Sequence, residues 1–240
     1  MSLPAERCII RTLTAVFAEE RRRPGNAGRQ EHSKREPMTA IIDYDAGNLK
    51  SVEKALISLG DTPVATRDAQ TICRADRVIL PGVGAFGEAM RQIRGYGLEE
   101  PIREAAAKGT PFLGICLGLQ LLFESSEESP GISGLGLLKG QIRRIPAGPD
   151  LKIPHIGWNS LEIRPQARLF KGVGEGSYVY FVHSYYLQAA NEEIVAATTD
   201  YGVHIHASVE AGNVFACQFH PEKSSRVGLQ ILRNFIELPG

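Results

Sequence analysis

Short apolar runs alternate with longer segments of helical periodicity along residues 38–140. The apolar runs are rich in β-branched residues and end in glycine or other turn residues, which predicts strands at 39–43, 77–80 and 111–115. The remaining periodic segments predict helices at 49–59, 102–108 and 117–124. This alternation is typical of βα units around a parallel sheet.

The pattern changes after residue 140, where predicted strands follow one another closely. They lie at 141–145, 159–163, 178–186, 194–199, 203–209 and 213–219. A last helix is predicted at 225–235 and covers the sheet. Parallel βα units joined to antiparallel strands predict one mixed α/β domain over residues 38–240, with a mostly parallel sheet flanked by helices.

The first 37 residues differ from the rest. They contain eight Lys or Arg and five Glu residues, with a run rich in Pro and Gly after a basic triplet. We expect residues 1–37 to be a flexible, solvated extension outside the fold, with Met38 as the natural start. The segment lacks the apolar core of a secretory signal, and it contains the acids that a transit peptide avoids.

Composition narrows the class of protein. Of 240 residues, 43% are hydrophobic and 22% charged, which is typical of a globular chain. Twenty-seven Lys and Arg balance 27 Asp and Glu, so no net field favours nucleic acid or a membrane surface as partner. No apolar run reaches the roughly 18 residues of a membrane span. Four Cys without a CxxC pair argue against a disulfide scaffold or zinc knuckle and favour the cytoplasm.

The strongest chemical signal is the segment Gly114-Ile115-Cys116-Leu117-Gly118. A predicted strand meets a predicted helix there, and the flanking glycines leave room for a sharp turn with Cys116 exposed at its top, as in a nucleophile elbow. The helix N-terminus favours the thiolate form of cysteine. The alternative is that Cys116 packs in the core, as strand-end cysteines often do.

A thiolate nucleophile needs a general base, and the base needs an orienting acceptor. Among six histidines, His220 stands out because Glu222 follows two residues later, on the same side of an extended chain. Pro221 favours that extended backbone at His220. His204 and His206 also share a strand face, but spacing supplies no further ligand, so a surface strand is favoured there and no metal is expected.

The segments GICLGLQLLF (114–123) and QFHPEKS (218–224) resemble the class I glutamine amidotransferases, whose triad follows a Cys, His, Glu order. Four further segments are similar to the glutaminase subunits of imidazole glycerol phosphate synthase within that family. They are DAGN at 45–48, PGVGAF at 81–86, HIGWN at 155–159 and YFVHSY at 180–185. The resemblance covers residues 38–240 and leaves the upstream segment unexplained.

The resemblance implies a mechanism and a set of site residues. Cys116 attacks the side-chain amide of L-glutamine, His220 transfers protons, and Glu222 holds and stabilises the imidazolium. The oxyanion hole is expected from the Leu117 N–H and the loop of Gly82, Val83 and Gly84. The residues it implies for glutamine binding are Gln120, Glu128, Gly84, His183, Ser184 and Tyr185. On its own, Gln120 is equally consistent with a solvated helix position.

The resemblance also implies a partner. This is a cyclase subunit with a (β/α)8 barrel, which forms a heterodimer with the glutaminase and uses its ammonia in histidine biosynthesis. The chain has no phosphate-binding glycine loop and no dinucleotide motif, so no cofactor is expected and the phosphorylated substrate belongs to the partner. Asn48, Trp158 and Lys223 are expected at the interface, with core packing as the alternative for Trp158.

Two other functions use the same residues differently. A γ-glutamyl peptidase would apply the cysteine and histidine to a peptide, and an idle relative would serve only as a binding scaffold. The intact triad argues against the scaffold, and the PGVGAF and HIGWN segments argue against the peptidase.

Overall fold

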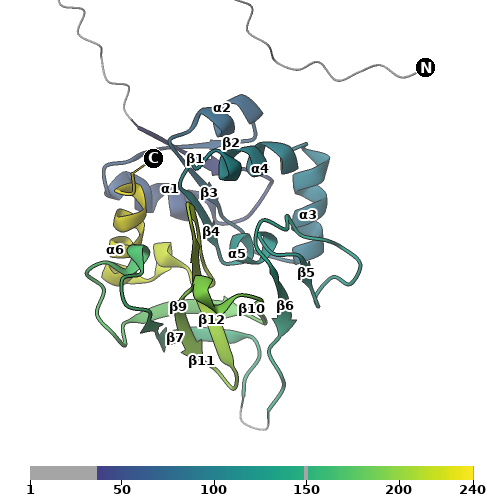
Figure 1. Ribbon diagram of the computed structural model, residues 1–240, viewed down its shortest axis with the longest axis vertical. Coiled ribbons are helices and arrows are strands. Elements are labelled where there is room, and N and C mark those ends of the chain that lie inside the picture. The colour runs from purple at the N-terminus through teal and green to yellow at the C-terminus, as the bar shows by residue number, and fades with distance from the viewer. Residues whose placement is uncertain (1–36, 149–150, 240) are drawn as a thin grey trace, which may run out of the picture. The chain divides into compact units, whose positions relative to one another are not determined.

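An eight-stranded sheet forms the centre of the structure, a computed structural model that describes residues 37–148 and 151–239 (Figure 1). Its strands lie in the order β2 (Thr62–Thr66), β1 (Met38–Ile42), β3 (Arg77–Leu80), β4 (Phe112–Ile115), β13 (Val214–Cys217), β12 (His204–Ala211), β11 (Val195–Asp200) and β8 (Glu162–Ile163). The first five are parallel and the last three antiparallel. The predicted mixed α/β class is confirmed. Residues 1–36 of the predicted extension lie outside the described residues.

Helices cover both faces of this sheet (Figure 1). They are α1 (Leu49–Ser58), α2 (Ala69–Arg74), α3 (Phe86–Gly95), α4 (Glu99–Ala107), α5 (Leu117–Leu121) and α6 (Ser225–Ile236). Apolar residues of α1 and α6 join one core cluster, and those of α2, α3 and α4 join the other. Within 37–148 and 151–239, no helix combines the length and apolarity needed to cross a membrane.

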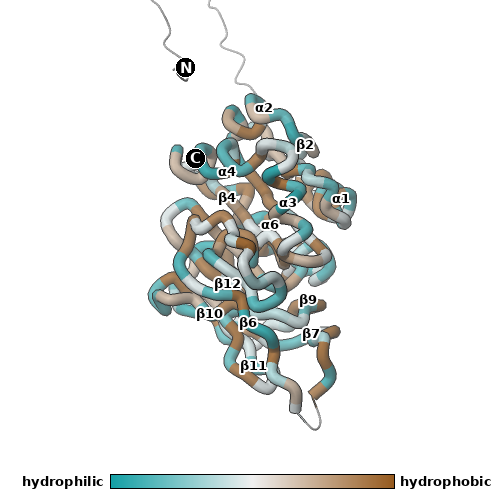
Figure 2. The backbone as a smooth tube through the Cα atoms, turned by 90° about the vertical axis from the view of Figure 1, so that its right-hand side faces the viewer, coloured by the Kyte–Doolittle hydropathy of each residue, from teal (hydrophilic) through white to brown (hydrophobic). Residues whose placement is uncertain are grey.

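The inner strands supply side chains to both clusters. Ile41 and Ile79 belong to the cluster under α1 and α6, whereas their neighbours Ile42 and Leu80 belong to the cluster on the opposite side. Successive strand residues point to opposite faces, so a strand buried on both sides is apolar throughout. All four residues of β4 are buried, and in Figure 2 brown, hydrophobic stretches recur along the backbone.

Two small sheets extend the structure. β7 (His155–Ser160) pairs antiparallel with β9 (Tyr178–His183), and β6 (Gly140–Arg144) joins β10 (Tyr185–Ala189) to β5 (Ser125–Ser126). Three short 3-10 helices complete the described elements: η1 (Arg168–Phe170), η2 (Glu192–Ile194) and η3 (Pro221–Lys223).

The sequence pattern was wrong about several element boundaries. The single strand predicted at 178–186 is two strands in different sheets, divided at Ser184, and the one at 159–163 is divided between β7 and β8. The strand β2 and the helices α2 and α3 were not predicted. β2 is largely exposed, so its residues carry little of the apolar signal on which a prediction depends.

The sheet topology brings four loops to one edge. They follow the carboxyl ends of the neighbouring strands β1, β3, β4 and β13, and they contain Asn48, Gly82, Cys116 and His220 respectively. Ligands of open α/β sheets bind at this edge, because the loops there converge. Residues separated by up to 172 positions thus meet at one place.

The turn from β4 into α5 depends on glycine. A Cβ placed on Gly118 would lie 1.8 Å from the Leu80 carbonyl oxygen, at the end of β3. On the other side of Cys116, a Cβ on Gly114 would lie 2.9 Å from the Gly118 backbone. The two glycines therefore let α5 press directly against the strands.

We expect Gly118→Ala to lower the free energy of unfolding by about 3 kcal/mol or more, because backbone atoms must separate to admit the methyl group. Gly95→Ala is the matched control. Gly95 is exposed in α3 with nothing within 4 Å of its Cβ position, so this change should be neutral or slightly stabilising. Urea unfolding of both variants tests the difference, and equal stabilities would contradict the packing argument.

Candidate active site

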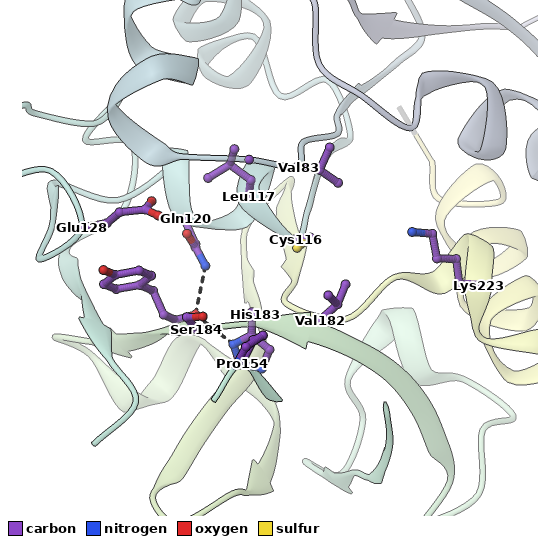
Figure 3. Close-up of a pocket in the computed structure, with 12 residues that line it drawn as sticks. Val83, Cys116, Leu117, Gln120, Glu128, Pro154, Val182, His183, Ser184 and Lys223 are labelled. Atoms are coloured by element: carbon purple, nitrogen blue, oxygen red, sulfur yellow. Dashed lines mark hydrogen bonds between the residues drawn. The ribbon is translucent and has the colours of Figure 1, made fainter. Parts of the chain in front are cut away.

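A cavity of about 430 Å³ opens at the carboxyl edge of the sheet (Figure 3). Its lining consists of Val83, Gly84, Cys116, Leu117, Gln120, Glu128, Pro154, Val182, His183, Ser184, Tyr185 and Lys223. All six residues expected to bind glutamine are among them. In Figure 3, Gln120 and Glu128 lie on one side of Cys116 and Lys223 on the other.

Cys116 sits at the top of the turn in an unusual backbone conformation. Its φ of 55° and ψ of −109° lie outside the regions that non-glycine residues favour. Its N–H donates to the Cys217 carbonyl oxygen at 2.8 Å, which ties the turn to β13. Although buried, Cys116 lines the cavity at the start of α5. The elbow geometry is therefore present, with the strain typical of functional sites.

His220 and Glu222 form a buried pair. His220 Nδ1 and Glu222 Oε1 are 2.7 Å apart, and both side chains are almost fully buried. Burial alone lowers the pKa of His220, but hydrogen bonding and charge interactions with Cys116 and Glu222 outweigh it and raise this pKa to about 9. The imidazole is therefore a cation at neutral pH, held beside the Glu222 carboxylate.

The backbone around this pair differs in part from the sequence expectation. His220 is extended, as a residue before proline should be. Pro221 to Lys223, however, form the 3-10 helix η3, so Glu222 reaches the ring through a tight turn and not along an extended chain. Ser224 closes the turn, because its hydroxyl donates to the His220 carbonyl oxygen at 2.7 Å.

Gln218 is a site residue that sequence reasoning missed. Its Nε2 lies 3.7 Å from Cys116 Sγ, and its Oε1 accepts a hydrogen bond of 3.0 Å from Gln120 Nε2. Gln120 Nε2 also donates to the Tyr185 carbonyl oxygen at 3.0 Å. Because that carbonyl can only accept, it fixes which way both amides point and leaves an N–H group facing the sulfur. Gln120 is buried, so the solvated-helix alternative is wrong.

The loop of Gly82, Val83 and Gly84 lies beside the nucleophile. The Leu117 N–H, expected as an oxyanion donor, donates to the Gly82 carbonyl oxygen at 3.3 Å. Gly84 has a φ of 101°, which glycine adopts without strain. In this conformation the loop presents the Gly82 carbonyl oxygen, and not an N–H group, beside Leu117.

Tyr44 is a second residue that sequence reasoning missed. Its hydroxyl donates to the Pro81 carbonyl oxygen at 2.8 Å, at the start of the same loop. Burial, together with the nearby charge of Cys116, raises the pKa of Tyr44. The phenol therefore stays protonated and keeps its donor. In the sequence, only the position of Tyr44 just after β1 indicates that it belongs to the site.

Of the three residues expected at a partner interface, two lie at the site. Asn48 Nδ2 donates to Glu222 Oε1 at 2.6 Å. Lys223 is exposed and lines the cavity. Trp158 is 50% exposed, so the alternative that it packs in the core is wrong.

The matches with known proteins agree with this geometry. The model of the glutamine amidotransferase class-I family matches residues 40–238. This chain belongs to the class-I glutamine amidotransferase family. It is 53% identical over 199 residues to imidazole glycerol phosphate synthase subunit HisH of Moorella thermoacetica. The aligned region covers 83% of this chain and 94% of the relative. The same subunit of Trichormus variabilis is 50% identical over 202 residues, covering 83% and 95%.

Solved structures show the same fold. A crystal structure of a glutamine amidotransferase superposes with a TM-score of 0.66 at 22% sequence identity, covering 82% of this chain and 97% of the other. The predicted resemblance to the class I amidotransferases is confirmed, and so is the similarity to the HisH subunits.

Metal ligands do not gather in the described part of this amidotransferase. No group of three or more His, Cys, Asp or Glu side chains there is placed to hold an ion. His204 Nδ1 lies 2.9 Å from Asp200 Oδ1, whereas His206 Nδ1 accepts a hydrogen bond from the Ala189 N–H. The two imidazoles on β12 are thus engaged separately.

Two further histidines support the wall of the amidotransferase cavity. His183 Nδ1 lies 2.9 Å from the Tyr185 carbonyl oxygen, so Nδ1 carries the proton and Nε2 accepts from His155 Nδ1 at 3.0 Å. Burial lowers the pKa of His183 to about 3 and that of His155 to about 4. Both rings are therefore neutral at pH 7.

This pair should make the protein sensitive to acid. A histidine whose pKa is depressed on folding contributes stability above its unfolded pKa of about 6.5 and loses that contribution as the pH falls. We expect His183 to account for a loss of roughly 1.4 kcal/mol per pH unit between pH 6 and 4. In urea unfolding over this range, His183→Gln should show a shallower pH dependence than the unsubstituted chain. An unchanged slope in His183→Gln would contradict the assignment.

Proposed function

We propose that this chain is the glutaminase subunit of an imidazole glycerol phosphate synthase. It hydrolyses L-glutamine to glutamate and passes the ammonia to a cyclase subunit in histidine biosynthesis. The observation that carries the proposal is Cys116 at the cavity together with the buried pair of His220 and Glu222, in a chain about 50% identical to HisH subunits. The cytoplasmic location stays a prediction from the cysteine pattern.

The mechanism uses the charge state of the site. Cys116 attacks the side-chain carbonyl carbon of glutamine as a thiolate, and the imidazolium of His220 gives its proton to the departing ammonia. The neutral imidazole then takes a proton from water, which attacks the thioester and releases glutamate and the thiolate. Glu222 stabilises the imidazolium in both half-reactions through the 2.7 Å contact at Nδ1.

The cavity has groups suited to both ends of free glutamine. Glu128 Oε2 accepts a hydrogen bond of 2.7 Å from the Phe86 N–H, which orients the carboxylate while its negative charge remains available to the α-ammonium group. The backbone of His183, Ser184 and Tyr185 forms the facing wall with Gln120 beside it. The backbone of Gly84, in the loop of Gly82, Val83 and Gly84, also lines the cavity. We assign glutamine binding to these residues.

The proposed partner binds next to the cavity. The β7–β9 register places Ile156 and Trp158 on the same face as Tyr178, and these side chains are 60%, 50% and 59% exposed. Aromatic residues that are exposed in a free subunit are typical anchors of protein interfaces. Lys223 and Val83, at the cavity mouth, are exposed as well. We assign this surface to the cyclase barrel, so that ammonia passes between the subunits without entering solvent.

Cys116→Ala should abolish glutamine-dependent synthesis by the complex and leave synthesis from ammonium salts intact, because the cyclase performs the later chemistry. His220→Ala should behave alike. Glu222→Gln should lose less activity, since Glu222 contributes to the rate by orienting His220 and does not itself form a bond to the substrate. Product formation with each nitrogen source is the measurement. Retained turnover in Cys116→Ala would remove it as nucleophile, and preference for a γ-glutamyl dipeptide over free glutamine would favour a peptidase.

The loop conformation predicts that the isolated chain is a poor glutaminase. The Leu117 N–H, which should serve as an oxyanion donor, is hydrogen-bonded to the Gly82 carbonyl oxygen instead. Losing one oxyanion donor typically lowers the rate by a factor of about 10² to 10³. Rotation of a peptide plane between Gly82 and Gly84 would replace the carbonyl with an N–H group, and a bound, occupied cyclase would favour that state. Glutamate release should rise from the isolated chain to the complex, and again with nucleotide substrate. Equal rates in all three would contradict this coupling.

A further inference from the structure

Asn48 occupies the N-cap position before α1, but its side chain does not cap the helix. An asparagine there usually accepts a hydrogen bond from a backbone N–H of the first turn. Here the side chain makes no capping bond, and the backbone is left-handed with a φ of 75°. The carboxamide instead reaches Glu222, 174 residues later in the chain. Asn48 therefore forgoes a local stabilising contact for one in the active site.

The contact has a defined polarity. An ionised carboxylate only accepts hydrogen bonds, so the Asn48 amide nitrogen must face Glu222. Oε1 of Glu222 accepts both from Asn48 Nδ2 at 2.6 Å and from His220 Nδ1 at 2.7 Å. Oε2 is buried, with no hydrogen-bond partner among the described residues. Two donors on a single oxygen thus determine how the carboxylate is oriented.

We propose that Asn48 is a positioning residue that holds the Glu222 carboxylate toward His220 during glutamine hydrolysis. The terminal torsion of a glutamate side chain has a broad energy minimum, so one donor alone leaves the carboxylate free to turn. Asn48 supplies the second donor and limits that rotation. It acts through Glu222 and His220 and does not line the glutamine cavity, so its loss should slow turnover without weakening substrate binding. This inference rests on the proposed glutaminase function.

The left-handed backbone allows a clean deletion of the side chain. Glycine adopts this conformation readily, so Asn48→Gly removes the carboxamide with little backbone strain. Asn48→Asp keeps the shape and also tolerates the backbone, but it replaces a donor with a second carboxylate beside Glu222. A purely structural role for position 48 predicts that the aspartate variant is the more active of the two. The positioning role predicts the opposite order.

The experiment measures glutamine turnover by the full chain, saturated with the cyclase and its nucleotide substrate. Asn48→Gly should lower kcat by about 10- to 100-fold, the usual effect of losing a hydrogen bond to a charged group, with KM for glutamine changed by less than about twofold. Asn48→Asp should lower kcat further. Unchanged kcat in Asn48→Gly, or higher activity in Asn48→Asp than in Asn48→Gly, would overturn the proposal.

Matched controls separate the possible causes. Gln166→Gly makes a similar exchange at an exposed left-handed position outside the site, and it should leave turnover unchanged. Synthesis from ammonium salts should stay normal in both Asn48 variants, because it does not use Glu222. If turnover by Asn48→Gly recovers at cyclase concentrations above those that saturate the unsubstituted chain, Asn48 serves the interface and the positioning role is wrong. An inactive Cys116→Ala beside a fully active Asn48→Gly would refute only this inference, whereas turnover in Cys116→Ala would remove the glutaminase mechanism itself.

Discussion

The contact of Gly118 with the Leu80 carbonyl is the constraint on which the site depends. A side chain at position 118 would push α5 away from the end of β3, since the space for its first carbon is already filled. With α5 held there, the chain must turn sharply at Cys116, and the Leu117 N–H comes within hydrogen-bonding distance of the Gly82 carbonyl oxygen. Cys116 and the loop of Gly82, Val83 and Gly84 are thus placed by the same backbone packing.

The hydrogen bonds among Gln120, Gln218 and His183, near Cys116, each have one fixed direction. The Tyr185 carbonyl oxygen accepts from Gln120 and from His183, which determines the orientation of the first amide and the tautomer of the imidazole. The orientation of the Gln120 amide determines that of the Gln218 amide, whose N–H group faces the sulfur of Cys116. In a low-dielectric interior each of these bonds is expensive to break, so the network keeps a single arrangement.

The triad and the family were predictable because their signals are local. Gly114 and Gly118 flank Cys116 within five residues, and Glu222 lies two residues from His220, so spacing alone suggests an elbow and an oriented base. The mixed α/β class followed from apolar runs whose period matches strands and helices. Boundaries were less accurate where the signal was weak: β2 is largely exposed, and a polar residue, Ser184, divides a continuous strand-like run between two sheets.

Local residue patterns were thus enough to predict the class of fold, the family and the pairing of His220 with Glu222. Tertiary structure alone decided that Asn48 contacts Glu222, that Tyr44 holds the Pro81 carbonyl, and that the Leu117 N–H is occupied by Gly82. The physical reason is the parallel sheet. Its strand order brings the ends of β1, β3, β4 and β13 together, although they are far apart in the chain, and no spacing within one segment reports which loops will meet.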